Sequence, residues 1–357
     1  MRNVTKILLS LVITIVLLFT IIGCTSQKEE ATTVEITDMV GDVVTVKKNP
    51  TKVACVSRTS YDLLVAFGLS DCIDGAYVKN LDHAWAEILY PNSANHYKYE
   101  YEPSYELLLS RGVDLVFAPE KRIAEGLREH GLTAITISLY GTPTFDEYVP
   151  YIADMVTKIW DDESVKHKAI EWKTNVQTTI ADIQSQIPTT ATPKKVFYVR
   201  GDKDKGINYT DTKGSFVEYA YRILGLNCMS AILENDGNRP SAESICEFNP
   251  DIFVMGGVYQ NKHVADIKST APYTTLDAVK NNQIYTIPMG FTQMEQINAF
   301  TAEFFCDQAN KLYPDVFHFD VKSMMKASIK KYFGTDVTDT QIEYMLAGLS
   351  PTGGNLY

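Results

Sequence analysis

Residues 165–187 read VKHKAIEWKTNVQTTIADIQSQI, and this run decides the architecture of the chain. Its main apolar positions are Val165, Ala169, Trp172, Val176, Ile180, Ile183 and Ile187. Their spacing alternates between three and four residues, which places them on one face of an α-helix. At 1.5 Å per residue this helix extends about 35 Å, which is longer than a small lobe. Its other faces are polar, as expected of a helix that lies across two lobes.

Short apolar strands alternate with helical stretches on both sides of this helix. We expect strands at 52–57, 73–78, 114–118 and 134–139 before it, and at 195–199, 251–255 and 284–287 after it. Strands that alternate with helices indicate right-handed βαβ units on a mainly parallel sheet. The sequence therefore predicts an α/β fold with two lobes, a bridging helix and a helical tail over 321–349.

The first 27 residues have the three-part layout of a secretion signal. Arg2 and Lys6 precede an uncharged apolar run over 7–22, and small Gly23 and Cys24 follow it. The residues around Cys24 resemble a bacterial lipobox, which implies cleavage before Cys24 and a diacylglycerol on its sulfur. An uncleaved membrane anchor is the alternative, because residues 7–27 are long enough to span a bilayer of about 30 Å. Both alternatives place the bulk of the chain outside the cytoplasm, tied to the cell membrane.

These observations divide the chain into five parts. We expect a signal peptide at 1–23, a lipidated flexible tether at 24–33, an N-terminal α/β lobe at 34–142, bridging helices at 143–190, and a C-terminal α/β lobe with its helical tail at 191–357.

Composition excludes several classes of partner and site. The formal net charge of −11 argues against nucleic acid and against direct docking on anionic lipid. Five cysteines remain when Cys24 is assigned to the lipid, and no CxxC pair occurs among them. Neither a disulfide framework nor a zinc site is therefore indicated.

Two segments, one on each side of the long helix, are similar to each other. Residues 103–116 read PSYELLLSRGVDLV and residues 241–254 read SAESICEFNPDIFV. Each is a short helix that begins near a Glu, then a turn, then an Asp that leads into a strand. This unit resembles one that occurs twice in the iron-complex, heme and vitamin B12 substrate-binding proteins of ABC importers. Residues 37–53 and the segments at 287–290, 309–317 and 332–334 are similar to the start and the end of that family.

The resemblance implies two Rossmann-like lobes with central parallel sheets, joined by one long rigid helix, with the ligand in a cleft between them. It implies a monomer without catalytic activity and without an intrinsic cofactor, which delivers its ligand to an ABC permease and ATPase complex. In the family, one Glu on each lobe pairs with permease arginines, and those positions match Glu106 and Glu243.

Ligands of α/β sheets bind beyond the carboxyl ends of the strands, so the cleft residues should follow the strand ends. The candidates are Arg58, Tyr77, Lys121, Arg122, Tyr140, Arg200, Tyr209, Tyr259, Met289 and Phe291. Aromatic side chains suit a planar or apolar chelate, and arginines can hold carboxylates or an oxyanion through two hydrogen bonds. His83, His96 and His263 stay open as metal ligands, since they lie in expected loops.

The resemblance and these residues favour an iron chelate such as a siderophore, a heme or a corrinoid as ligand. A molybdate- or tungstate-type oxyanion is the alternative, although residues 292–296 (TQMEQ) lack the arginine or tryptophan of that branch. A secreted two-lobe α/β enzyme or an adhesin is the alternative from a different class. The sequence contains no GxSxG, GxxxxGK[ST] or HExxH motif, which argues against the enzyme.

Overall fold

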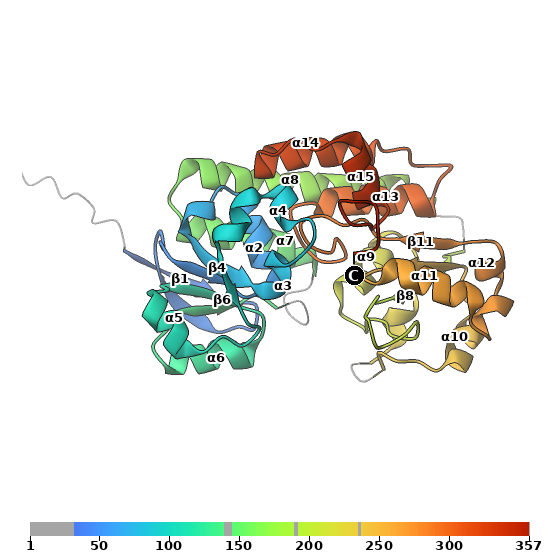
Figure 1. Ribbon diagram of the computed structural model, residues 1–357, viewed down its shortest axis with the longest axis horizontal. Helices are drawn as coiled ribbons and strands as arrows, with labels where there is room; N and C mark the ends of the chain where they lie inside the picture. Colours follow the sequence, from blue (N-terminus) through green and yellow to red (C-terminus); the bar gives the residue numbers. More distant parts are fainter. Residues whose placement is uncertain (1–31, 139–144, 189–191, 235–236, 357) are drawn as a thin grey trace, which may run out of the picture. The chain divides into compact units, whose positions relative to one another are not determined.

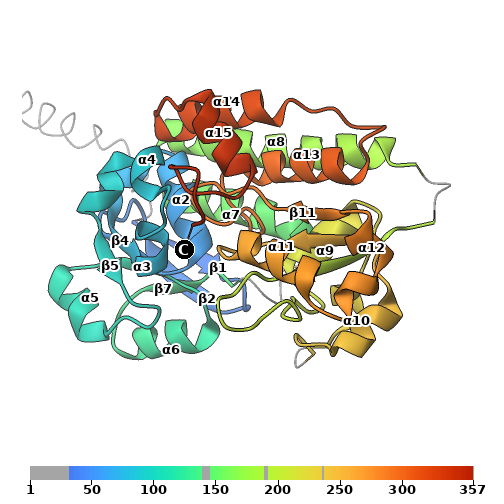
Figure 2. The same cartoon turned by 45° about the vertical axis from the view of Figure 1, so that its right-hand side comes forward.

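The computed structural model describes residues 32–138, 145–188, 192–234 and 237–356, of which Val34 onward belong to one compact unit. The prediction for Cys24 and the signal segment lies outside these residues. The predicted α/β class with two parallel sheets, a long helix and a helical C-terminal region is confirmed (Figures 1 and 2). The boundaries of the five parts stay a prediction.

The first lobe is built on a five-stranded parallel sheet. Its strand order is β5-β4-β3-β6-β7, with β3 at Val53–Cys55, β4 at Ile73–Tyr77, β5 at Tyr97–Tyr99, β6 at Leu115–Ala118 and β7 at Ala134–Thr136. The central strands β3 and β6 are buried throughout, as expected of a parallel sheet with both faces covered. The helices of this lobe are α2 (Arg58–Ala66), α3 (Val78–Leu81), α4 (Ala86–Leu89), α5 (Tyr105–Arg111) and α6 (Lys121–Glu129). A two-stranded sheet of β1 (Thr33–Thr37) and β2 (Val43–Lys47) precedes it.

The second lobe repeats the design with a four-stranded parallel sheet. Its order is β11-β10-β8-β9, with β8 at Lys195–Val199, β9 at Asn227–Cys228, β10 at Ile252–Met255 and β11 at Ile284–Thr286. The helices of this lobe are α9 (Phe216–Ile223), α10 (Ala242–Phe248), α11 (Gln260–Ser269) and α12 (Asp277–Lys280). Short 3₁₀ turns lie at Ser70–Cys72, Pro91–Asn95, Met229–Ile232 and Tyr273–Thr275.

The long helix predicted over 165–187 is α8, which runs unbroken from Glu163 to Gln186. Asp162 caps its N-terminus, because the carboxylate accepts hydrogen bonds from the backbone of Ser164 and Val165. Trp172 is fully buried and meets Phe67 of the first lobe at 5.6 Å between ring centroids. At the other end, Ile187 lies close to Gly225 of the second lobe. The apolar face therefore packs as predicted, while α7 (Phe145–Ile159) and α13 (Thr301–Leu312) flank the helix.

The chain also crosses between the lobes outside α8. In residues 287–300, Ile287 hydrogen-bonds Met255 of the second lobe, and the Ala299 backbone donates to Asp62 of the first lobe. The C-terminal region contains α14 (Val321–Phe333) and α15 (Asp339–Leu346), and the residues that follow α15 contact both lobes. Trp85 Nε1 of the first lobe donates to Leu349 O at 2.9 Å, and Asn261 of α11 donates to Gly348 O at 3.0 Å.

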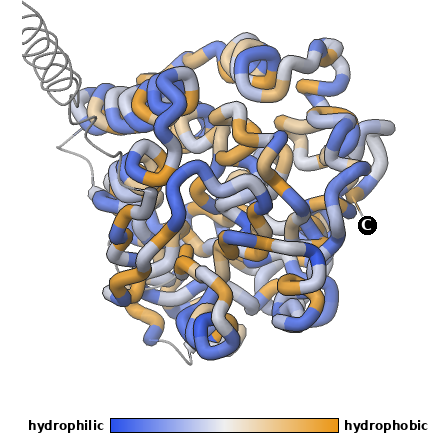
Figure 3. The backbone as a smooth tube through the Cα atoms, turned by 90° about the vertical axis from the view of Figure 1, so that its left-hand side faces the viewer, coloured by the Kyte–Doolittle hydropathy of each residue, from blue (hydrophilic) through white to orange (hydrophobic). Residues whose placement is uncertain are grey.

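Peripheral helices expose a polar face and bury an apolar one. In Figure 3, hydrophilic and hydrophobic residues alternate along the outer helices, as expected of amphipathic helices on a core. Among the described residues, no helix is long and apolar enough to cross a bilayer.

Asp62 of α2 makes the stability of this unit depend on pH. Its side chain is fully buried, and burial raises its pKa from 3.8 to about 8. The folded state therefore holds this proton more tightly than the unfolded state, so stability falls as pH rises from about 4 to about 8. We expect Asp62→Asn to become more stable than the wild type by several kcal/mol at pH 8, since each pKa unit corresponds to about 1.4 kcal/mol.

The measurement is urea unfolding of both proteins at pH 4, 6 and 8. The asparagine side chain of the variant keeps an oxygen that can accept from the Ala299 backbone, so the two proteins should be nearly equal at pH 4. If the difference in stability between Asp62→Asn and the wild type stays constant between pH 4 and pH 8, the raised pKa of Asp62 is contradicted.

Candidate functional site

One arginine follows the first strand of each parallel sheet. Arg58 begins α2 directly after β3, and Arg200 directly follows β8. The Arg58 guanidinium lies 5.4 Å from the ring centroid of Tyr77, and that of Arg200 lies 5.5 Å from the ring centroid of Tyr209. Each lobe therefore presents a cation beside a tyrosine at the carboxyl end of its sheet, and the role of these four residues in ligand binding stays a prediction.

The first-lobe arginine is held by a residue from far along the chain. Arg58 Nη1 donates to Gln293 Oε1 at 3.0 Å, and Asn80 Nδ2 donates to the Arg58 carbonyl at 3.0 Å. Tyr77 packs edge-on against Tyr101 at 5.6 Å, and the Tyr101 hydroxyl donates to Glu120 at 2.6 Å. These contacts fix the position of the guanidinium and leave it partly exposed.

The second-lobe site is more strongly cationic than the sequence analysis indicates. Lys205 Nζ lies 4.3 Å from the Tyr209 ring centroid and donates to its hydroxyl at 3.2 Å. The Arg239 guanidinium lies 5.7 Å from the same centroid. With Arg200, three cations surround one tyrosine. Lys205 and Arg239 lie in loops without periodicity, so no sequence signal connected them to Tyr209.

Two buried acids lie beneath this cationic surface. Arg200 Nη1 donates to Asp211 Oδ1 at 3.0 Å, and burial raises the pKa of Asp211 although Arg200 opposes the shift. Glu295 accepts from the Gly257 backbone at 2.5 Å, and burial raises its pKa as well. In both carboxyls burial opposes ionisation, whereas the charge of Arg200 favours it, and Asp211 forms an ion pair with Arg200 at 3.0 Å.

The pair Gly256-Gly257 has a structural role in this arrangement. A Cβ at Gly256 would lie 2.6 Å from the Tyr198 ring, and Gly257 has a φ of +69° that side-chain-bearing residues rarely adopt. The two glycines let the end of β10 turn tightly against the end of β8. Just after this turn, the backbone N–H of Tyr259 donates a hydrogen bond to Gly201 O at 3.3 Å.

Four other candidates have partners of their own. Lys121 pairs with Asp42 and Glu125, and Arg122 pairs with Glu102, and both cationic side chains are exposed. Met289 and Phe291 are 0% exposed and belong to the core, where Phe291 stacks on Phe333 at 5.4 Å. The structure thus differs from the expectation that Met289 and Phe291 present a surface to a ligand. Tyr140 lies outside the described residues.

The histidines do not assemble a metal site in the described part of the chain. His83 is 6% exposed, and burial lowers its pKa to about 4. His263 is fully buried and its Nε2 pairs with the Asp202 carbonyl, whereas His96 Nδ1 pairs with the Tyr61 hydroxyl at 2.7 Å. No group of three or more His, Cys, Asp or Glu side chains in the described ranges is placed to hold a metal ion.

Glu106 and Glu243 occupy equivalent positions in the two lobes. Each is exposed in the first turn of a seven-residue helix, α5 or α10, that a serine caps (Ser104 or Ser241). A hydrogen bond from its own backbone N–H lowers the pKa of each carboxyl, so both are ionised at neutral pH. In Figures 1 and 2, α5 and α10 each lie on the side of their lobe away from α8.

Comparison with known proteins identifies the family of the chain. The model of a family described as periplasmic binding protein matches residues 53–289. The chain belongs to this family. The match confirms the resemblance inferred from the paired helix–turn–strand units, which lie at 103–116 and 241–254.

Individual relatives of this periplasmic binding protein are distant in sequence. An uncharacterized ABC transporter substrate-binding lipoprotein of Bacillus subtilis, YvrC, is 22% identical over 301 residues, which cover 82% of this chain and 89% of the relative. The molybdate-bound MolA of Haemophilus influenzae superposes with a TM-score of 0.69 at 17% identity, covering 85% of this chain and 99% of MolA. CeuE of Helicobacter pylori with Ni(II) bound gives 0.70 at 16% identity, covering 88% and 99%. These structures share the fold with this chain.

Proposed function

We propose that this protein is an extracytoplasmic substrate-binding protein of an ABC importer, and that its ligand is a negatively charged metal chelate. The observation that carries this proposal is the pair of arginines, Arg58 and Arg200, each beside a tyrosine at the carboxyl end of a first strand. Lys205 and Arg239 add positive charge around Tyr209. Such a surface suits carboxylate, catecholate or propionate oxygens, which arginine binds strongly.

A ferric siderophore fits this chemistry best, followed by heme, whose propionates are anionic. A corrinoid has no comparable anionic edge, so the arginines favour it less. In this proposal the chelator supplies the metal coordination and the protein binds the outside of the complex. The protein itself performs no chemistry in this proposal.

Molybdate or tungstate is the second candidate. Two arginines could hold an oxyanion, and the fold superposes on that of molybdate-bound MolA. The tyrosines at Tyr77, Tyr101 and Tyr209 favour the larger chelate, because aromatic rings bury apolar area that a tetrahedral oxyanion lacks.

We further propose lipid attachment through Cys24, a monomeric state, and docking to the permease through Glu106 and Glu243. With one exposed, ionised carboxylate on each lobe, the protein can make two charged contacts with arginines of the permease. Two separate contacts attract the protein to the permease and also fix its orientation there.

The test is ligand binding by the purified protein, followed by quenching of its intrinsic fluorescence. The probes are a ferric triscatecholate, ferric citrate, heme, cyanocobalamin and molybdate. We expect the ferric chelates to bind most tightly. Protein purified from its own host gives a second readout, because a ferric siderophore shows a broad charge-transfer band, heme a Soret band and cobalamin a corrin spectrum. Tightest binding of molybdate would favour the second candidate, and no binding of any probe would overturn the proposal.

A further inference from the structure

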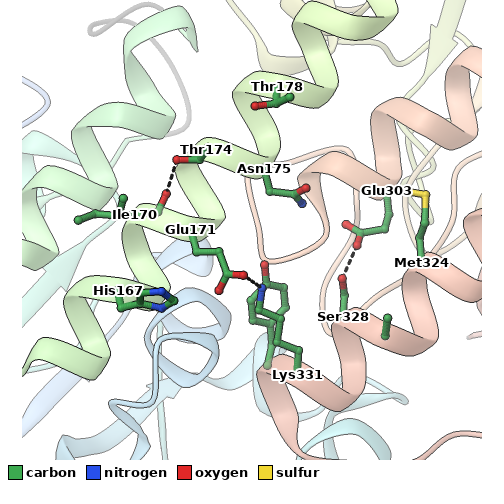
Figure 4. Close-up of a pocket in the computed structure, with 12 residues that line it drawn as sticks. His167, Ile170, Glu171, Thr174, Asn175, Thr178, Glu303, Met324, Ser328 and Lys331 are labelled. Carbon is green, nitrogen blue, oxygen red and sulfur yellow. Dashed lines mark hydrogen bonds and ion pairs between the residues drawn. The ribbon is translucent and has the colours of Figure 1, made fainter.

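A groove of about 740 Å³ lies between α8 and α14, and Glu303 of α13 also lines it (Figure 4). Its volume falls in the range of small-molecule sites. The residues that matter for its chemistry are Ile170 and Asn175 of α8, Glu303 of α13, and Met324, Ser328 and Tyr332 of α14. None of the ligand candidates of the two sheets lines it, so the groove is separate from the proposed transport site.

Glu303 is the unusual group in this groove. Its side chain is 2% exposed, yet it lines the groove and reaches toward Asn175 in Figure 4. One carboxyl oxygen accepts from the Ser328 hydroxyl. The other oxygen, Oε2, has no hydrogen-bond partner among the residues that the structure describes. A buried carboxyl with an unused oxygen is costly for the fold, and a bound hydrogen-bond donor would offset that cost.

The charged neighbours of Glu303 do not supply this donor. Lys331 of α14 acts on Glu303 electrostatically, but its ammonium is bound to Glu171 of α8 at 2.6 Å. His167 of α8 lines the groove as well, and Tyr332 of α14 is buried beside it. With the Lys331 charge balanced by Glu171, the carboxyl of Glu303 gives the groove an acidic character.

We propose that this groove binds a small organic cation, an ammonium group carried on a short apolar body. Because Oε2 is buried, the Glu303 side chain must turn toward the groove on binding, so that the ammonium donates to its carboxyl and to the Asn175 side-chain carbonyl, while the apolar body packs against Ile170 and Met324. Ile170 is 48% exposed, so it has apolar area to cover. The net charge of −11 raises the local concentration of cations around the protein.

Cation binding at Glu303 should be coupled to proton release. Burial raises the pKa of this carboxyl to about 7, so a large fraction of the protein carries the proton below pH 7. A bound ammonium favours the ionised form, and the proton leaves as the cation enters. The affinity should therefore rise from pH 6 to pH 8, whereas the charge of a primary ammonium does not change in that range.

The test is calorimetric titration of the full chain with benzylammonium at pH 6 and pH 8, with benzyl alcohol as the neutral control. At pH 6 the binding enthalpy should change with the ionisation enthalpy of the buffer, which measures the released proton. We expect binding of benzylammonium, at least tenfold weaker binding of benzyl alcohol, and at least fivefold tighter binding of the cation at pH 8 than at pH 6.

Two variants locate the site independently. Glu303→Gln should weaken benzylammonium binding at least tenfold and abolish proton release. Ala327→Trp fills the groove from an exposed position of α14, so it should block binding even if Glu303→Gln fails to fold. Glu247→Gln removes an exposed acid on α10 and should change nothing. Absence of binding by the wild type, or unchanged binding in Ala327→Trp, would overturn the proposal.

Discussion

Reversing the charge of Glu106 and Glu243 together, as Glu106→Arg with Glu243→Arg, should abolish uptake and leave ligand affinity unchanged. Both carboxylates are exposed and ionised, and each lies in the first turn of the same kind of capped helix in its lobe. If arginines of the permease pair with these two carboxylates, the double variant places like charges opposite each other at both contacts. Like charges at a docking interface suppress association and prevent the correct orientation.

The measurement combines uptake of radiolabelled ferric chelate by cells with fluorescence titration of the purified variant. We expect uptake at the level of cells that lack the protein, with a dissociation constant within twofold of the wild type. Glu129→Arg with Glu247→Arg is the matched control, because it changes the net charge equally at exposed sites on α6 and α10. If the control abolishes uptake as well, the effect is one of overall charge and the assignment of Glu106 and Glu243 is wrong.

Removing both arginines, as Arg58→Ala with Arg200→Ala, should weaken binding of an anionic ferric chelate about 100-fold or more. A hydrogen bond to a charged group contributes about 1.5–3 kcal/mol, and the double variant loses at least one such bond in each lobe. The affinity of the variant Arg58→Lys with Arg200→Lys should lie between those of the wild type and the double alanine variant. Lysine keeps the charge but cannot form paired hydrogen bonds.

Fluorescence titration with a ferric triscatecholate gives these affinities. Arg222→Ala with Lys280→Ala removes two exposed cations from α9 and α12 and serves as the control. A wild-type affinity in the Arg58 and Arg200 double variant would remove both residues from the binding site, whereas the docking proposal for Glu106 and Glu243 would stand.

Periodic signals in the sequence predicted the main frame of the molecule. The spacing of Val165, Ala169, Trp172 and Val176 predicted α8 because a long helix with one apolar face has few alternatives. The buried strands β3, β6, β8 and β10 were predicted for a similar reason, since a short apolar run between polar segments is typical of a parallel strand.

Short elements and loop contacts were not predictable in the same way. The edge strand β5 lies inside the aromatic cluster at residues 96–101 (HYKYEY), where no strand was predicted. In the structure Tyr99 is buried and its hydroxyl donates to Asp74 at 2.6 Å, whereas the ring of Tyr101 packs against that of Tyr77. Strand-end position gives the edge of the sheet at which a residue lies, but long-range packing decides whether its side chain is exposed. The buried Met289 and Phe291 illustrate that limit.

The connection of the two lobes by three segments has a practical consequence for building a fluorescent biosensor from this protein. The helix α8, residues 287–300 and the tail at 345–349 all join the same two lobes, so dyes placed at the far tips would change their separation little on binding. A single environment-sensitive dye at Gln296 is the better design. Gln296 hydrogen-bonds Gln293, whose side chain holds Arg58, so an anion that captures this guanidinium would disturb the dye directly.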